Sequence, residues 1–163
     1  MRRMDGLSAF MLEQESTGAY MHTLKIAILD TSDIPGGWEF RRFRHSVASR
    51  IDLLPMLRWK FLRVPFGLHH PVWVDDTDFD LDYHVRRIAC PAPGDRVALC
   101  DLISQVYAYQ MDLSKPLWML WVVEGLEEGQ VALVTLLHHA YTDGTGAARL
   151  LTRVYSATPQ DIE

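Results

Sequence analysis

The sequence contains only two cysteines, Cys90 and Cys100, and their spacing matches neither a metal site nor a redox motif. We therefore expect free, inert thiols and a cytoplasmic location, because a reducing compartment does not support a disulfide framework. Long apolar runs are also missing. No stretch approaches the roughly 20 residues that span a bilayer, and the first residues lack the apolar segment of a signal peptide. Peripheral contact with a membrane stays open.

Basic residues are scarce as well. Sixteen Lys and Arg against 21 Asp and Glu give a formal net charge of −5. Binding of a phosphate backbone needs a basic surface, so we exclude nucleic acid as the main partner. The chain also lacks a serine in a nucleophile elbow and a glycine-rich phosphate loop. If the chain is an enzyme, these absences favour direct general-base catalysis over an acyl-enzyme.

An acidic stretch resembles a calcium loop but lacks two of its key residues. Asp78, Asp80 and Asp82 match positions one, three and five of an EF-hand loop. The sixth position is Tyr83 instead of glycine, and the twelfth is Ala89 instead of glutamate. We therefore expect no calcium site here.

The composition indicates one globular domain over residues 1–163, with 48% hydrophobic and 23% charged residues. Apolar periodicity predicts an α/β fold with a mixed sheet flanked by helices. A short loop between residues 118–124 and 131–138 predicts an antiparallel hairpin. The helix capped by Asp95 should turn Leu99, Ile103 and Val106 inward. The other expected elements are strands over 23–28, 59–64, 72–74 and 84–88, and helices over 40–54 and from 146 to about 158.

The most informative motif is HHxxxDG at residues 138–144, directly after an apolar run over 131–137. Neighbouring residues of a strand point to opposite faces, so His138 and His139 cannot easily serve one site. One ring should enter a cavity while the other packs behind the sheet. A neutral imidazole is the common protein base near pH 7, and His139 is our candidate for that role.

The motif has two other interpretations. His139 and Asp143 are four residues apart and could bind a metal from one helix face, but no third ligand stands at a recognisable spacing, so we expect no metal. A purely structural histidine stays an alternative. We expect Asp143 to accept hydrogen bonds from the turn or to pair with a buried arginine. Gly144 would allow backbone angles that other residues resist.

Together with HHxxxDG, further segments make the chain resemble the N-terminal half of the bacterial wax ester synthase/diacylglycerol acyltransferase family. These segments are Leu7-Ser8-Ala9-Phe10-Met11-Leu12-Glu13, Met21-His22-Thr23, Pro65-Phe66-Gly67, residues 71–76, residues 79–87 and Pro116-Leu117-Trp118. The resemblance implies one half of a two-domain, chloramphenicol acetyltransferase-like fold of CoA-dependent acyltransferases, with a tunnel between the halves. The C-terminal half is absent from this chain.

The resemblance also implies a reaction: transfer of an acyl group from acyl-CoA to a fatty alcohol or diacylglycerol. His139 would then be the general base, with His138 supporting it, Asp143 holding the loop and no cofactor beyond the acyl-CoA substrate. The implied partners are a lipid hydroxyl acceptor, the missing C-terminal half, and a membrane or lipid-droplet surface. Two alternatives stay open: a condensation-type acyltransferase with a carrier-bound donor, and a non-catalytic lipid-binding or interaction half-domain. Aromatics such as Trp118 or Trp121 are candidates for an exposed, apolar inner face, and a position in the core is the equal alternative for either.

Overall fold

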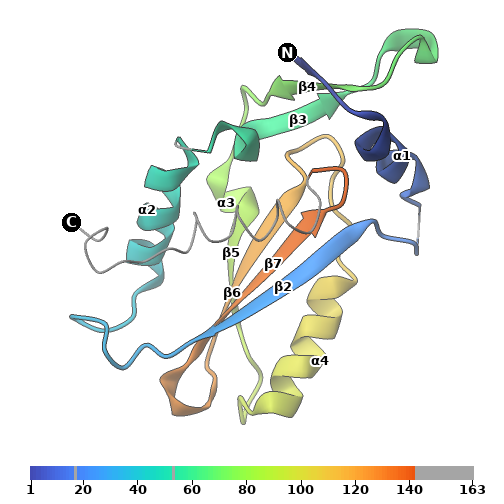
Figure 1. The fold of residues 1–163 in the computed structure, drawn as a ribbon. Coiled ribbons are helices and arrows are strands. Elements are labelled where there is room, and N and C mark those ends of the chain that lie inside the picture. Colours follow the sequence, from blue (N-terminus) through green and yellow to red (C-terminus); the bar gives the residue numbers. More distant parts are fainter. Residues whose placement is uncertain (17, 53, 142–163) are drawn as a thin grey trace.

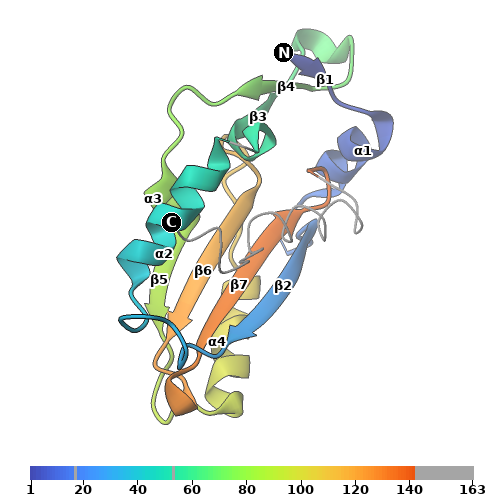
Figure 2. The same cartoon turned by 60° about the vertical axis from the view of Figure 1, so that its left-hand side comes forward.

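The computed structural model describes residues 1–16, 18–52 and 54–141, and its centre is a four-stranded sheet (Figure 1). The strands lie in the order β2-β7-β6-β5, which is clearest in Figure 2. Their bounds are β2 His22–Leu29, β5 Val85–Ala89, β6 Trp118–Glu124 and β7 Val131–His138. β7 is antiparallel to both β2 and β6, whereas β5 is parallel to β6. The predicted α/β class with a mixed sheet is confirmed.

The β6–β7 hairpin forms the middle of this sheet. Every residue of β7 is buried, because a strand between two neighbours with both faces covered needs an apolar run instead of alternation. The predicted antiparallel pairing is observed, with Trp118 opposite Leu137 and Val123 opposite Ala132. Trp118 is 4% exposed and its Nε1–H donates to the Leu57 carbonyl at 2.7 Å. Of the two alternatives for Trp118, the core position is the one observed, and Trp121 is half-buried.

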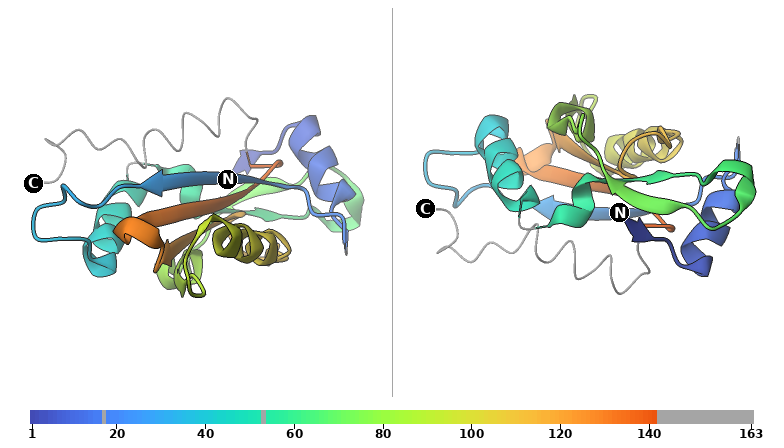
Figure 3. Two further views of the ribbon diagram at one scale, coloured as in Figure 1. Left: turned by 90° about the horizontal axis from the view of Figure 1, so that it is seen from below. Right: turned by 90° about the horizontal axis from the view of Figure 1, so that it is seen from above.

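Helix α4, Arg96–Tyr107, covers one face of the sheet (Figure 3). Its first turn is capped as predicted, since the Asp95 carboxylate accepts a hydrogen bond from Ala98 N–H at 2.8 Å. The buried residues are Leu99, Leu102 and Val106. Ile103 is only partly buried, so the centre of the apolar face lies one residue earlier than the sequence suggested.

The opposite face of the sheet packs against α2, Phe40–Ile51, and against the elements of a second, smaller sheet. That sheet has the order β1-β4-β3 and is antiparallel. Helix α1, Gly6–Gln14, lies at the same end of the molecule and was not predicted (Figure 1). The remaining bounds are β1 Arg2–Arg3, β3 Trp59–Leu62, β4 Val72–Asp75, α3 Leu81–His84 and 3₁₀ turns η1 Pro55–Arg58, η2 Pro65–Gly67 and η3 Glu127–Gly129.

Several boundaries differ from the sequence prediction by a few residues. Helix α2 ends at Ile51, and Leu54 lies outside it, as expected for a residue that precedes a proline and is disfavoured in helical conformation. β3 ends at Leu62, before the turn that Pro65 begins. The strand expected over 84–88 begins at Val85, after the short helix α3. The helix expected after residue 146 lies outside the described residues. In the described part of the chain, no helix is long and apolar enough to cross a membrane.

A close backbone contact between two loops gives a test of this fold. A Cβ atom at Gly94 would lie 2.1 Å from the Gly125 carbonyl oxygen, and the φ angle of Gly94 is +80°. Gly94→Ala should therefore lower the free energy of unfolding in urea by roughly 2–4 kcal/mol, from the clash and the left-handed backbone together. The matched control is Gly129→Ala, whose φ is +68° with no atom within 4 Å of the added Cβ. Equal losses for the two variants would contradict the loop contact.

Candidate active site at the end of β7

His138 is the last residue of β7 and is fully buried. Its backbone N–H donates to the Leu117 carbonyl at 3.1 Å, and its own carbonyl accepts from Tyr141 N–H at 2.9 Å. The first bond holds the strand end against the segment that precedes β6. The second begins the turn that follows the strand. The backbone of the HHxxxDG motif is thus fixed on both sides of His138.

The hydrogen bonds of the His138 ring define its protonation. Ala140 N–H donates to Nδ1 at 2.9 Å, so the proton of the neutral ring is assigned to Nε2. Burial lowers the pKa of His138 to about 4, and repulsion from His22 and His139 adds to the effect. At neutral pH this ring is therefore uncharged, and its hydrogen bond from Ala140 fixes its orientation.

His139 has the opposite environment. It lies one residue beyond the strand, its side chain is exposed, and its backbone N–H donates to the Met21 carbonyl at 2.8 Å. The structure thus separates the two imidazoles as the alternation of strand residues predicts: His138 packs inside and His139 reaches the surface. Only His139 can meet a substrate directly in this arrangement.

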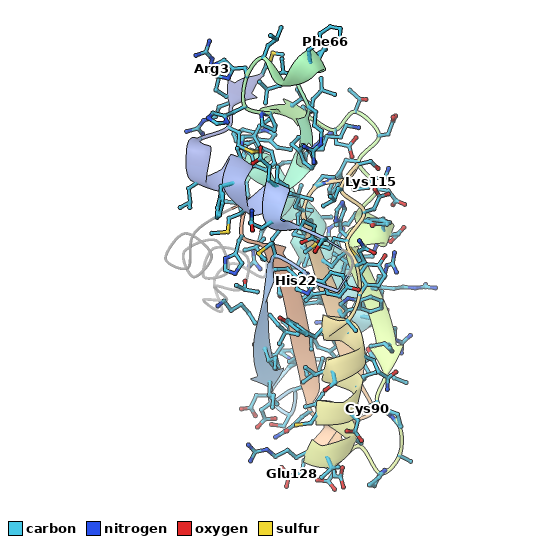
Figure 4. All side chains as sticks on the ribbon, turned by 90° about the vertical axis from the view of Figure 1, so that its right-hand side faces the viewer. Arg3, His22, Phe66, Cys90, Lys115 and Glu128 are labelled. Atoms are coloured by element: carbon cyan, nitrogen blue, oxygen red, sulfur yellow. The ribbon has the colours of Figure 1, made fainter. Side chains whose placement is uncertain are left out.

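Two further residues near the motif were not identified from the sequence. His22 is opposite His138 in the β2–β7 register and is buried, and its Nε2 lies 2.9 Å from the Tyr107 carbonyl oxygen that accepts its proton. Figure 4 shows His22 between α1 and one end of α4. Glu15 follows α1, and its side chain is 3% exposed. Its Oε2 accepts from Met21 N–H at 2.5 Å and lies 3.5 Å from His138 Nε2.

Burial also lowers the pKa of His22, although the Tyr107 carbonyl and the Glu15 charge act against this shift. His22 and His138 both interact with the charge of His139. Three imidazoles and one carboxylate are therefore close enough to influence each other. Only the outermost imidazole is exposed to solvent.

A pocket of about 320 Å³ begins directly after His139 in the sequence. Ala140 and Tyr141 form part of its wall, and Tyr141 contacts Trp73 edge-to-face with ring centroids 5.5 Å apart. Its lining combines charged and polar side chains with aromatic ones. The remaining lining residues are Arg2, Arg3, Asp5, Ser8, Met56 and Trp59. The two residues that follow His139 in the sequence thus line this pocket, and His139 itself does not.

His84 shows what a structural histidine looks like in this fold. It is completely buried, its Nδ1 lies 2.7 Å from the Trp118 carbonyl oxygen, and its ring is stacked against Phe79 and Trp118. Burial lowers its pKa to about 4. His84 has no access to solvent, in contrast to His139, so the structural interpretation fits His84 and His138 but not His139.

Two of the predicted site residues, Asp143 and Gly144, lie outside the described residues, and their roles stay predictions. Cys90 is buried and Cys100 is exposed, and both are free. Among residues 1–16, 18–52 and 54–141, no group of three or more His, Cys, Asp or Glu is arranged to hold a metal ion.

Comparison with known proteins places this chain in a family. The family described as the wax ester synthase/diacylglycerol acyltransferase catalytic domain matches residues 4–163. A Mycobacterium tuberculosis protein provisionally named a diacylglycerol O-acyltransferase is 52% identical over 161 residues, which are 99% of this chain and 34% of that protein. Another M. tuberculosis protein with this provisional name, tgs3, is 37% identical over 161 residues, covering 95% of this chain and 58% of its own length.

Comparison with solved structures agrees with the family match. The wax ester synthase/diacylglycerol acyltransferase from Marinobacter aquaeolei VT8 superposes with a TM-score of 0.74 and 28% identity, over 94% of this chain and 36% of that one. A starter condensation domain of rhizomide synthetase, crystallised with C8-CoA, shares the fold with a TM-score of 0.72 and 16% identity, over 94% of this chain and 34% of that one. The chain spans about a third of the length of the first relatives it matches. It belongs to the wax ester synthase/diacylglycerol acyltransferase family.

Proposed function

We propose that the protein containing this chain transfers a fatty acyl group from acyl-CoA to the hydroxyl of a fatty alcohol or a diacylglycerol. The observation that carries the proposal is the exposed ring of His139, held at the end of β7 beside a buried, neutral His138. Membership of the family supports the reaction class. In this chemistry acyl-CoA is a substrate, and the chain's own groups need no further cofactor.

The proposed reaction begins when His139 accepts the proton of the acceptor hydroxyl. The oxygen attacks the thioester carbonyl, and a tetrahedral intermediate forms. Its collapse breaks the carbon–sulfur bond, and the leaving thiolate takes the proton back from His139, which yields free CoA and the new ester. The base is regenerated and no acyl-enzyme forms. Positioning of the two substrates must supply much of the remaining acceleration.

The proposal assigns supporting roles to the residues around the base. His138 holds Ala140 N–H and so shapes the turn that follows His139. We propose that Asp143 and Gly144 complete this turn. We further propose that the protein works in the cytoplasm, in peripheral contact with a membrane or lipid droplet that supplies its apolar acceptor.

The direct test is an assay of the full-length protein with radiolabelled acyl-CoA and a panel of long-chain alcohols and diacylglycerols. We expect labelled wax ester or triacylglycerol. The fold likeness to condensation domains favours a second candidate, transfer from a carrier-bound acyl group. Label transfer only from an acylated carrier protein would select that alternative, and binding of lipid without transfer from either donor would indicate a non-catalytic module.

The isolated chain gives a separate prediction. A tunnel between two halves cannot exclude water or hold an acyl chain when one wall is missing. We therefore expect purified residues 1–163 to show no acyl-CoA turnover, and we expect activity to return when the remaining part of the protein is added as a second chain. Sedimentation during the assay should report the complex. Robust turnover by the monomeric chain would overturn the two-half arrangement.

A further inference from the structure

Glu15 is an unusual residue for its position. Its side chain is 3% exposed, whereas Glu13, two residues earlier, is exposed. A carboxylate directly after a helix faces the negative end of the helix dipole, which is unfavourable. Buried carboxylates are rare unless they have partners. The helix therefore does not stabilise a carboxylate at this position. The groups that contact the Glu15 side chain must stabilise it instead.

The first partner of Glu15 is the backbone that holds the exposed histidine. Glu15 Oε2 accepts from Met21 N–H at 2.5 Å, and the carbonyl of the same Met21 accepts from His139 N–H at 2.8 Å. The segment that leads into β2 is thus fixed on one side by Glu15 and binds His139 on the other. Loss of the carboxylate would release the Met21 N–H and loosen the segment that holds the base.

The second partner is the ring of His138. Glu15 Oε2 lies 3.5 Å from Nε2, the nitrogen that carries the proton in the neutral ring. Because burial lowers the pKa of His138 to about 4, this contact joins a neutral imidazole to a carboxylate and is not an ion pair. At 3.5 Å it is longer than a good hydrogen bond, so it acts mainly by orienting the ring dipole.

We propose that Glu15 is a positioning residue for the histidine pair: one carboxylate oxygen orients the His138 ring and fixes the Met21 peptide that holds His139. The inference rests on the proposed function for its kinetic consequence. Its structural consequence can be tested without any turnover. Glu15 does not touch the substrate, and its effect on the reaction passes through His138 and His139.

Two variants of Glu15 can test whether its oxygen, and not its charge, is what matters. A single oxygen, Oε2, makes both contacts. Glutamine retains one carbonyl oxygen in the same place, whereas alanine removes it. If Glu15 acts by positioning, Glu15→Gln should behave nearly as the wild type and Glu15→Ala should not. Glu13→Ala on the same helix is the matched control, because its side chain is exposed.

The kinetic arm uses the full-length protein with acyl-CoA and a long-chain alcohol. We expect Glu15→Ala to lower kcat about 10- to 100-fold, the scale of a small misplacement of the reacting groups, with KM for acyl-CoA changed less than threefold. Glu15→Gln should stay within threefold of the wild type, and Glu13→Ala should match it. A wild-type kcat in Glu15→Ala, or an equal loss in Glu15→Gln and Glu15→Ala, would overturn the proposal.

The spectroscopic arm is independent of turnover. Side-chain ¹⁵N spectra of histidine-labelled protein report the tautomer of His138, whose signals are assigned by their loss in His138→Gln. The Ala140 N–H bond to Nδ1 keeps the Nε2–H tautomer in every variant. We expect the Nε2 signal of Glu15→Gln to match that of the wild type, and the Nε2 signal of Glu15→Ala to shift because the carboxylate oxygen beside it is gone. Should Glu15→Ala fail to fold, Glu15→Met retains the side-chain length without an oxygen and should show the same shift of the Nε2 signal. Unchanged His138 signals in every folded variant that lacks the oxygen would contradict the proposal, even if the wild type transfers no acyl group.

Discussion

Replacing His139 with alanine should lower the rate of acyl transfer by roughly 10²–10⁴-fold, the usual contribution of a general base. The fold should survive, because the His139 side chain is exposed and contributes no core packing. Its backbone bond to the Met21 carbonyl does not depend on the side chain. The measurement is kcat/KM of the full-length protein with acyl-CoA and a long-chain alcohol, together with a thermal unfolding curve.

A matched control separates a missing base from a general effect of losing a histidine. His45 is exposed on α2, away from the end of β7, and His45→Ala should leave both turnover and thermal stability unchanged. If a well-folded His139→Ala protein retained turnover within a few fold of the wild type, His139 would have no place in the mechanism. Loss of stability in His139→Ala but not in His45→Ala would show a structural role instead.

Stability should fall steeply in mild acid. Burial lowers the pKa of both His84 and His138 to about 4 from an ordinary value of 6.5. Below pH 6.5 the unfolded chain therefore binds protons that the folded chain does not, and the free energy of unfolding decreases as the pH falls toward 4. Each ring can cost about 3 kcal/mol across this window, and below pH 4 both states are protonated, so the loss levels off.

The dependence of unfolding free energy on pH is the quantity to measure, by urea unfolding between pH 7.5 and 4. His84→Gln should reduce the slope between pH 6.5 and 4 whatever its effect on stability at pH 7.5, because the slope reports proton binding alone. His138→Gln should reduce it in the same way. The exposed His45 provides the control, since His45→Gln should leave the slope nearly intact. A slope that none of the three variants alters would rule out buried neutral histidines as the cause.

Local patterns predicted much of the fold. The β6–β7 hairpin followed from two apolar runs around a short loop, and the cap at Asp95 followed from the residue type before a helical pattern. The opposite environments of His138 and His139 followed from strand alternation alone. These features depend on neighbours in the sequence, which is why the sequence contains enough information to predict them.

Features that depend on contacts between distant segments were missed. Glu15 stands in a polar stretch that looks solvent-exposed, and only the packing of α1 against the end of β7 buries its carboxylate beside His138. His22 shows no local sign of its pairing with His138 across the sheet. The position of Trp118 stayed undecided because an aromatic residue at a strand start fits a core face as well as an interface, and the structure places it in the core. In each case the deciding partner is far away in the sequence.

The central claim is that His139 activates the acceptor hydroxyl for direct attack on the thioester. The fate of a radiolabelled acyl group in a single turnover of the full-length protein tests this claim most directly. With acyl-CoA alone we predict no label bound to the protein after denaturation, and with alcohol added we predict one labelled ester per active chain. Label bound to the protein at one equivalent without acceptor, and passed to the alcohol on its addition, would contradict the account.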